Sequence, residues 1–228
     1  TKHTGGGTSL KGASVARNAA IPWWYLWKIQ KGTYGPAWYS PCRTAGSGGW
    51  RLEPTYTYFL DQGLAGAMAA LFRSNRSVLE FGAGMGCYTE QLRRAGLDVR
   101  GFDGSTNVHE ITNGMIGRAD MTMPTLNLGA ADWSYSFEVG EHVPKLHEGT
   151  FLRNLVHHAR VGVVLSWSNH SGAGRGHVNA QPQQYILQRM RGLGFARDES
   201  ATRTLRQAIQ TTYWIGDTLN VYRRVSPA

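Results

Sequence analysis

The segment from Val78 to Leu92 constrains the fold more than any other part of the chain. It runs from Val-Leu-Glu-Phe, a pattern typical of a buried strand, into Gly-Ala-Gly-Met-Gly and then into a helix-forming stretch. Glycines at a strand-to-helix turn allow a tight bend and let the backbone approach a ligand closely. The pattern therefore predicts a ligand-binding turn at the edge of an α/β sheet.

The spacing of this turn excludes two common phosphate-binding motifs. A dinucleotide-binding turn is spaced G-x-G-x-x-G, but Cys87 stands where the third glycine would be. A nucleoside-triphosphate loop needs a lysine, which this segment lacks. Glu80, two residues before the first glycine, is unfavourable beside phosphates but compatible with a cationic amino-acid moiety.

Short apolar runs alternate with helical segments through the rest of the chain. The runs predicted as strands are Ser77–Phe81, Val99–Phe102, Trp133–Phe137 and Val161–Trp167. This alternation predicts an α/β fold, with a parallel sheet that helices cover on both faces.

Composition divides the chain into three regions. Residues 1–20 are rich in Gly, Ser, Thr, Ala and Lys, which predicts a disordered basic tail. Residues 21–73 hold five of the eight tryptophans and end in a helix predicted from Tyr56 to Arg73. We interpret this extension as a cap or a lid on the third region, residues 74–228.

The positive charge is concentrated at the N-terminus. Residues 1–52 contain seven Lys and Arg and no Asp or Glu, so that +2 of the net +9 remains for residues 53–228. A basic arm of this kind binds polyanions or improves solubility, and the sequence leaves both interpretations open.

The order of acidic and glycine features resembles the class I S-adenosylmethionine-dependent methyltransferases. In that family an acidic residue precedes G-x-G-x-G, the next strand ends in a carboxylate that holds the ribose hydroxyls, and an acid after the third strand accepts from the adenine amino group. Glu80, Asp103 and Asp120 stand at those places.

The resemblance implies a Rossmann-like fold with a mostly parallel, seven-stranded sheet. It also implies a helix from Pro182 to Arg191 and an antiparallel C-terminal hairpin of Tyr213-Trp214 with Leu219–Arg223. The implied cofactor is S-adenosylmethionine, with S-adenosylhomocysteine as its product. The residues expected to bind it are Glu80, Gly82, Ala83, Gly84, Gly86, Asp103, Gly104, Asp120, Met121 and Phe137.

The segment after the fourth predicted strand is expected to face the transferred methyl group, because ligands of open α/β sheets bind beyond the carboxyl ends of the strands. If the chain turns helically there, Glu138, Glu141 and His142 share one face. These three and His177 are our candidate catalytic residues, as carboxylate or imidazole general bases.

The same segment also resembles that of the ubiquinone-pathway O-methyltransferases and the small-RNA 2′-O-methyltransferases, where E-x-x-E-H can hold a divalent cation. We expect a site without a metal, with Glu138, Glu141 and His142 as ligands in the alternative. The glycine-rich loop after the fifth strand is expected to bind the acceptor. The residues expected to contact the substrate are Trp167, His170, His177, Asn179, Tyr34 and Trp38.

These features predict a methyltransferase that acts on an oxygen or nitrogen of a small molecule. The alternative is an RNA methyltransferase whose basic N-terminal arm follows the phosphates. A third interpretation is a binding module without turnover, against which the intact Glu80, Gly84 and Asp103 argue. We expect no membrane span, and a cytoplasmic monomer or homodimer.

Overall fold

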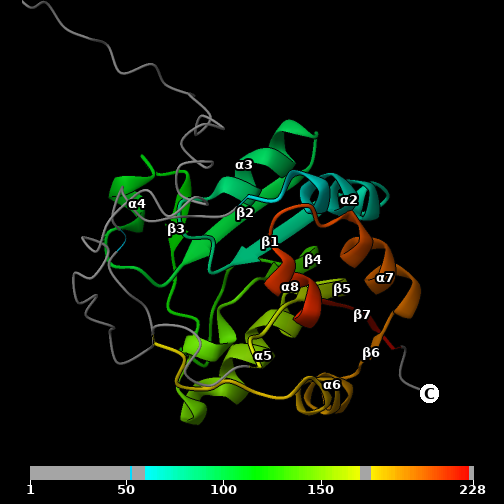
Figure 1. Ribbon diagram of the computed structural model, residues 1–228. Coiled ribbons are helices and arrows are strands. Elements are labelled where there is room, and N and C mark those ends of the chain that lie inside the picture. Colours follow the sequence, from blue (N-terminus) through cyan, green and yellow to red (C-terminus); the bar gives the residue numbers. More distant parts are fainter. Residues whose placement is uncertain (1–51, 53–59, 170–175, 226–228) are drawn as a thin grey trace, which may run out of the picture. The chain divides into compact units, whose positions relative to one another are not determined.

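The computed structural model describes residue 52 and residues 60–169 and 176–225. Its sheet has seven strands in the order β3-β2-β1-β4-β5-β7-β6 (Figure 1). The strands are β1 Ser77–Phe81, β2 Asp98–Asp103, β3 Ile116–Arg118, β4 Ala131–Ser136, β5 Ala159–Leu165, β6 Phe195–Arg197 and β7 Asn220–Arg224. The α-helices are α2 Gln62–Phe72, α3 Cys87–Arg94, α4 Val108–Ile111, α5 Glu148–His157, α6 Gln183–Gly192, α7 Glu199–Ala208 and α8 Tyr213–Thr218, with 3₁₀ helices η2 Gly140–His142 and η3 Lys145–His147.

The side chains of the central strands alternate between two cores. In β1, Leu79 and Phe81 belong to the core that also contains residues of α5 and α6. Val78 belongs to the core shared with α2, α3, α7 and α8. Figure 1 shows these two groups of helices on opposite sides of the sheet. Because successive residues of a strand point to opposite faces, this pattern confirms a sheet covered on both faces.

The mostly parallel, seven-stranded sheet is confirmed as well. Strands β1 to β5 are parallel, whereas β7 lies antiparallel between β5 and β6.

The predicted partner of the last strand is wrong. Tyr213 and Trp214 begin α8 instead of forming a strand, and β7 pairs with β5 and β6. The reason is the spacing of the apolar residues that follow. Ile215 and Leu219 are buried four residues apart, and the Leu219 amide donates to the Ile215 carbonyl. That spacing is helical, whereas Tyr213 is 70% exposed.

The strand order reverses between β1 and β4, which are neighbours in the sheet. The connection after β1 leads toward β2, and the connection after β4 leads toward β5. At such a switch point the loops diverge, so that a crevice opens at the carboxyl ends of the strands. The predicted cofactor and catalytic segments both begin at this crevice.

Buried Asp61 fastens the start of α2 to the segment before α8. Its Oδ1 accepts from the Leu64 amide at 2.9 Å and caps the helix. Its Oδ2 accepts from the amides of Gln210, Thr211 and Thr212 at 2.8, 2.7 and 3.1 Å. Burial raises the pKa of Asp61, but these four N–H groups together lower it by more. The resulting pKa lies below its ordinary value of 3.8.

We predict that Asp61→Ala lowers the free energy of unfolding by about 2–4 kcal/mol, because it leaves several buried N–H groups without an acceptor. Chemical denaturation at neutral pH measures this loss. Because folding lowers the pKa of Asp61, its contribution is present above pH 3.8 and disappears as the pH falls through the folded value. The control is Asp98→Ala, at an exposed position of β2. An equal loss in both variants would contradict the anchoring role.

Candidate cofactor and catalytic site

The turn between β1 and α3 needs its glycines for two reasons. Gly82, Gly84 and Gly86 have φ angles of 78°, 53° and 77°, in the left-handed region that favours glycine. A Cβ on Gly82 would lie 2.2 Å from a methyl group of Val139. Both the backbone conformation and the available space therefore restrict the turn, which agrees with the ligand-binding bend predicted from the sequence.

Asp103, the last residue of β2, binds this turn directly. Its Oδ2 accepts from the Gly84 amide at 2.8 Å, and its Oδ1 accepts from the Ser105 amide at 2.8 Å. Burial raises the pKa of Asp103, and the two N–H donors partly oppose that shift. Each carboxylate oxygen keeps a lone pair, so the group can still accept two hydroxyl donors side by side.

Glu80 lies on the α3 side of β1, 5% exposed, and accepts from the Thr89 hydroxyl. Burial raises the pKa of Glu80 to about 7, while the hydroxyls of Thr89 and Tyr135 act in the opposite direction. The carboxyl group is therefore close to half protonated at neutral pH. A cationic group placed nearby would draw it into the charged form.

Leu52 binds the segment that follows Asp103 at the end of β2. Its amide donates to Asn107 Oδ1 at 2.9 Å and to Ser105 Oγ at 3.2 Å, and its carbonyl accepts from Asn107 Nδ2 at 2.7 Å. The side chain is 2% exposed and packs in a cluster with Ala83 of the glycine turn. Leu52 thus lies next to the predicted cofactor site.

The remaining cofactor candidates follow the ends of β3 and β4, and their roles stay predictions. Asp120 Oδ1 accepts from the amide and hydroxyl of Thr122 at 2.9 and 2.6 Å, and its Oδ2 has no hydrogen bond with a described residue. Met121 is 5% exposed within the core, so a purine could touch only its edge. Phe137 is half-buried and meets Tyr88 edge to face at 5.4 Å.

Glu138 has a left-handed backbone, with φ at 52°. The helical turn considered for this segment does not include Glu138, and the short 3₁₀ helix η2 begins at Gly140. The Glu138 amide donates to Ser166 Oγ at 3.0 Å, and its Oε1 accepts from the Thr218 hydroxyl at 3.4 Å. A left-handed conformation costs a non-glycine residue about 1–2 kcal/mol, and such strain is concentrated at functional sites.

Glu141, His142 and His177 come together across the crevice. Their candidate ligand atoms lie within 4.8 Å of one another, and His177 Nε2 is 3.9 Å from Glu141 Oε1. Glu141 is fully buried, and neither of its carboxylate oxygens makes a hydrogen bond with a described residue. Burial and then the neighbouring Glu138 carboxyl raise the pKa of Glu141 well above its ordinary value. A carboxyl group in this position needs either a proton or a cation.

The tautomer of His142 follows from one contact. Its Nδ1 lies 3.0 Å from the Gly176 carbonyl, which can only accept, so Nδ1 carries the proton. Nε2 is then unprotonated, the form in which imidazole binds a metal or accepts a proton. Burial lowers the pKa of His142 to about 4, which keeps the ring neutral at physiological pH.

Two residues predicted to contact the substrate are buried. Trp167 and Asn179 are 0% and 3% exposed, and their polar groups bind other parts of the protein, so their contact with a substrate stays a prediction. The Trp167 indole donates to the Asn179 carbonyl at 2.8 Å, and the Asn179 amide donates to the Glu141 carbonyl at 2.8 Å. Both residues hold the His177 loop in place. His170, Tyr34 and Trp38 lie outside the described residues, as do the tail and most of the extension.

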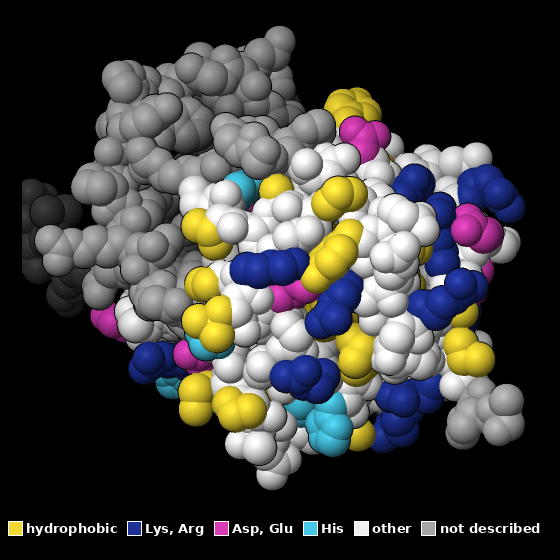
Figure 2. Space-filling model, turned by 90° about the horizontal axis from the view of Figure 1, so that it is seen from below, with side chains coloured by type: hydrophobic (Ala, Val, Ile, Leu, Met, Phe, Trp, Pro, Cys, Tyr) yellow, Lys and Arg dark blue, Asp and Glu magenta, His cyan; other side chains and the backbone are white. Residues whose placement is uncertain are grey.

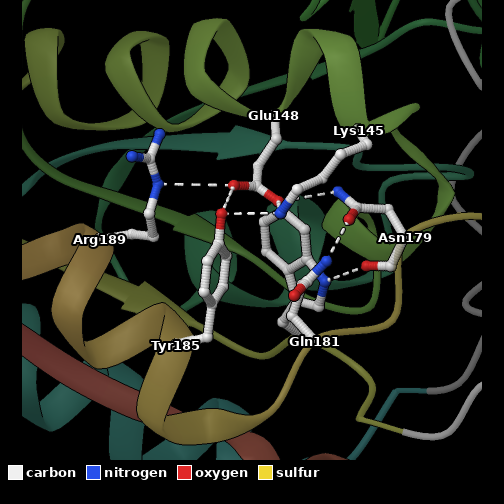
Figure 3. Close-up of polar contacts among 7 residues, drawn as sticks. Lys145, Glu148, Asn179, Gln181, Tyr185 and Arg189 are labelled. Atoms are coloured by element: carbon white, nitrogen blue, oxygen red, sulfur yellow. Dashed lines mark hydrogen bonds and ion pairs between the residues drawn. The ribbon is translucent and has the colours of Figure 1, made fainter.

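Buried Glu148 is a residue that the sequence analysis missed. It stands at the start of α5 with a side chain only 2% exposed (Figure 3). Its partners come from η3, α6 and the His177 loop, and they are Lys145 at 2.8 Å, Tyr185 at 2.5 Å, Arg189 at 3.4 Å and Asn179 at 3.1 Å. Nothing marks this residue in the sequence, because a glutamate in the first turn of a helix is also favourable at the surface.

The loop after β5 is therefore held at two places. The Val178 and Asn179 amides donate to the Glu141 carbonyl, and the Asn179 side chain donates to Glu148 while it accepts from Gln181 at 2.6 Å (Figure 3). Side chains on α5 and the loop thus fix where His177 stands relative to Glu141.

We predict that Glu148→Ala loosens this loop and increases amide hydrogen exchange at Val178 and Asn179, because both amides depend on the loop position. Exchange measured by mass spectrometry or NMR would detect the change. Glu110→Ala, at an exposed position of α4, serves as the control. Unchanged protection at Val178 and Asn179 would contradict the role given to Glu148.

Comparison with known proteins identifies the fold. No family model matches the sequence, and no curated protein matches it. Among solved structures, the chain is similar to magnesium protoporphyrin IX methyltransferase from Synechocystis PCC 6803 with bound SAH, at a TM-score of 0.53 and 15% identity over 70% of this chain and 81% of that one. The methyltransferase domain of bacterial CtHen1-C gives 0.53 and 16% over 72% and 98%.

The CcbJ methyltransferase from Streptomyces caelestis gives a TM-score of 0.53 at 10% identity, over 73% of this chain and 91% of that one. At these identities the likeness concerns the fold, which is the Rossmann-like fold of class I methyltransferases. Within the described residues, no helix is long and apolar enough to cross a bilayer.

Proposed function

We propose that the protein is a methyltransferase that uses S-adenosylmethionine to methylate an oxygen or nitrogen of its acceptor. The observation that carries this proposal is the contact between the Asp103 carboxylate and the Gly84 amide at the strand switch point. It places a bidentate acceptor for a vicinal diol beside the glycine turn.

In this proposal each cofactor group meets a suitable partner. S-adenosylmethionine supplies an electrophilic methyl group on a sulfonium. Asp103 accepts from the ribose hydroxyls, the free Oδ2 of Asp120 accepts from the adenine amino group, and Glu80 faces the charged amino-acid end. The left-handed turn from Gly82 to Gly86 lets the backbone lie close to the ligand.

Glu138, Glu141, His142 and His177 form the acceptor side of the site. The sequence led us to expect no metal there, but the arrangement of Glu141, His142 and His177 fits a divalent cation, because a buried carboxylate without a hydrogen bond to a described residue stands beside two imidazoles. A mixed oxygen and nitrogen set suits manganese or another transition metal better than magnesium. The cation would act as a Lewis acid and acidify an acceptor hydroxyl. Glu138 would orient that acceptor and take its proton.

A small molecule is our first candidate for the acceptor. Glu141 is fully buried and the His177 side chain is 13% exposed, and this burial favours a small acceptor. RNA is the second candidate, and the observation that favours it is the basic character of residues 183–225, which carry seven arginines and three acidic residues. The salt dependence of acceptor binding distinguishes the small molecule from RNA, because the affinity for phosphates falls steeply as the ionic strength rises.

We predict that Asp103→Ala weakens the binding of S-adenosylhomocysteine about 10- to 100-fold, the loss expected for hydrogen bonds to a charged group. Glu141→Ala and His142→Ala are expected to retain that affinity within about threefold while they abolish turnover. Calorimetric titration measures the affinities, and Asp103→Asn tests the charge without loss of volume. The assignment of roles fails if the three alanine variants lose affinity equally.

We predict that the protein, after a chelator has removed any bound metal, binds one Mn²⁺. Glu141→Ala and His177→Ala are expected to weaken this binding about 10- to 100-fold. Electron paramagnetic resonance of free Mn²⁺ reports binding independently of activity. His109→Ala, at an exposed position of α4, is the control. Absence of Mn²⁺ binding, or full activity after exhaustive chelation, would remove the metal but leave the methyl-transfer proposal standing.

A further inference from the structure

The charge of the folded domain is unevenly distributed. Residues 183–225 carry seven arginines, no lysine and only three acidic residues, a net charge of +4, whereas residues 53–182 carry a net charge of −2. Figure 2 shows Lys and Arg side chains across the face seen from below, several of them on the right-hand side, where α6, β6 and α7 lie in Figure 1. Exclusive use of arginine is informative, because the planar guanidinium matches two phosphate oxygens at once.

Three of these arginines line one pocket between α7 and β6. Its volume is about 370 Å³. The lining residues are Arg197, Glu199, Thr202, Arg203, Arg206 and Gln207. Arg197 and Glu199 form an ion pair at 3.1 Å, in which the carboxylate is mostly exposed. The pocket therefore contains three guanidinium groups and a single carboxylate.

Two of the guanidinium groups have unused donors. Nε of Arg197 is buried and has no hydrogen bond with a described residue. Arg203 forms neither a hydrogen bond nor an ion pair with any residue that the structure describes. A buried N–H group without an acceptor is costly, so a ligand that supplies acceptor oxygens would be stabilised here.

Arg206 is fixed at one side of the pocket by the backbone. Its Nε donates to the Leu219 carbonyl at 2.8 Å, and its Nη2 lies 3.4 Å from the Asp217 carbonyl. Burial and then the positive charge of Arg197 lower the pKa of Arg206. The two like charges are thus close enough to repel each other, and an anion between them would turn that repulsion into attraction.

We propose that this pocket binds a phosphate group, held by the guanidinium groups of Arg197, Arg203 and Arg206. The phosphate belongs to a nucleotide or to an RNA strand in preference to the free ion, because an aromatic side chain stands nearby. Tyr213 is 70% exposed at the start of α8, whose far end supplies the Asp217 carbonyl to Arg206. A helix of six residues spans roughly 9 Å. A base attached to the bound phosphate could therefore reach the Tyr213 ring.

The pocket is separate from the methyl-transfer site but adjacent to it. Leu219 accepts from Arg206, while the preceding residue, Thr218, donates to Glu138. The two sites thus lie on either side of one short segment. The inference does not rest on the proposed methyl transfer, since it concerns binding through other residues.

The test measures binding of three probes to the full chain, namely inorganic phosphate, adenosine monophosphate and a labelled single-stranded oligouridylate. Calorimetry serves for the first two and fluorescence anisotropy for the third. We expect Arg203→Gln, and more strongly Arg197→Gln with Arg203→Gln, to weaken binding of the nucleotide and the RNA at least tenfold. Arg118→Gln, at an exposed position of β3, should change it less than twofold. Affinity for S-adenosylhomocysteine should stay unchanged in every variant, which separates this inference from the proposed function.

The two sources of phosphate are distinguished in the same experiment. Tighter binding of RNA than of the nucleotide, lost in Tyr213→Ala and at high salt, supports a strand that stacks on α8. Equal binding of RNA and nucleotide, still dependent on Arg203, supports a single nucleotide. The proposal is overturned if neither binds at millimolar concentration, if only free phosphate binds, or if the arginine variants bind as well as wild type.

Discussion

The candidate site depends on the hydrogen bond between the Asp103 carboxylate and the Gly84 amide. This bond joins the end of β2 to the turn that follows β1, so two neighbouring strands deliver their functional groups to one point. The turn can take part because Gly82 leaves room for Val139, a residue of the catalytic segment after β4. The ends of β1, β2 and β4 therefore meet at the glycine turn, and a side chain on Gly82 would disturb all three.

The acceptor side is built on a different principle, the burial of charge. Glu141 and Glu148 are both buried, but only Glu148 is surrounded by cationic and hydroxyl donors. Glu148 thereby stabilises the loop that carries His177. Glu141 has no such donors among the described residues, and this difference separates a carboxylate with a structural role from one available for chemistry.

The fold and the cofactor side were predictable because their signals are local. The glycine spacing and the strand-terminal Asp103 can be read within a few residues, and the structure places them together. The acceptor side depends on contacts between distant segments. His177 joins Glu141 only through the fold, and Asn179 looks like a substrate ligand until its burial is known. The left-handed backbone at Glu138 could not be predicted, because no residue pattern reveals that conformation in a non-glycine residue.

The left-handed Glu138 sets a trade-off for anyone who engineers this protein. Glycine would suit that backbone better, so a screen that rewards only heat resistance would tend to select Glu138→Gly. The selected protein would be more stable, yet it would lack the carboxylate that we propose as a catalytic group. Libraries for thermal improvement should therefore leave codon 138 fixed, and the same position offers a route to a robust, inert scaffold for binding studies.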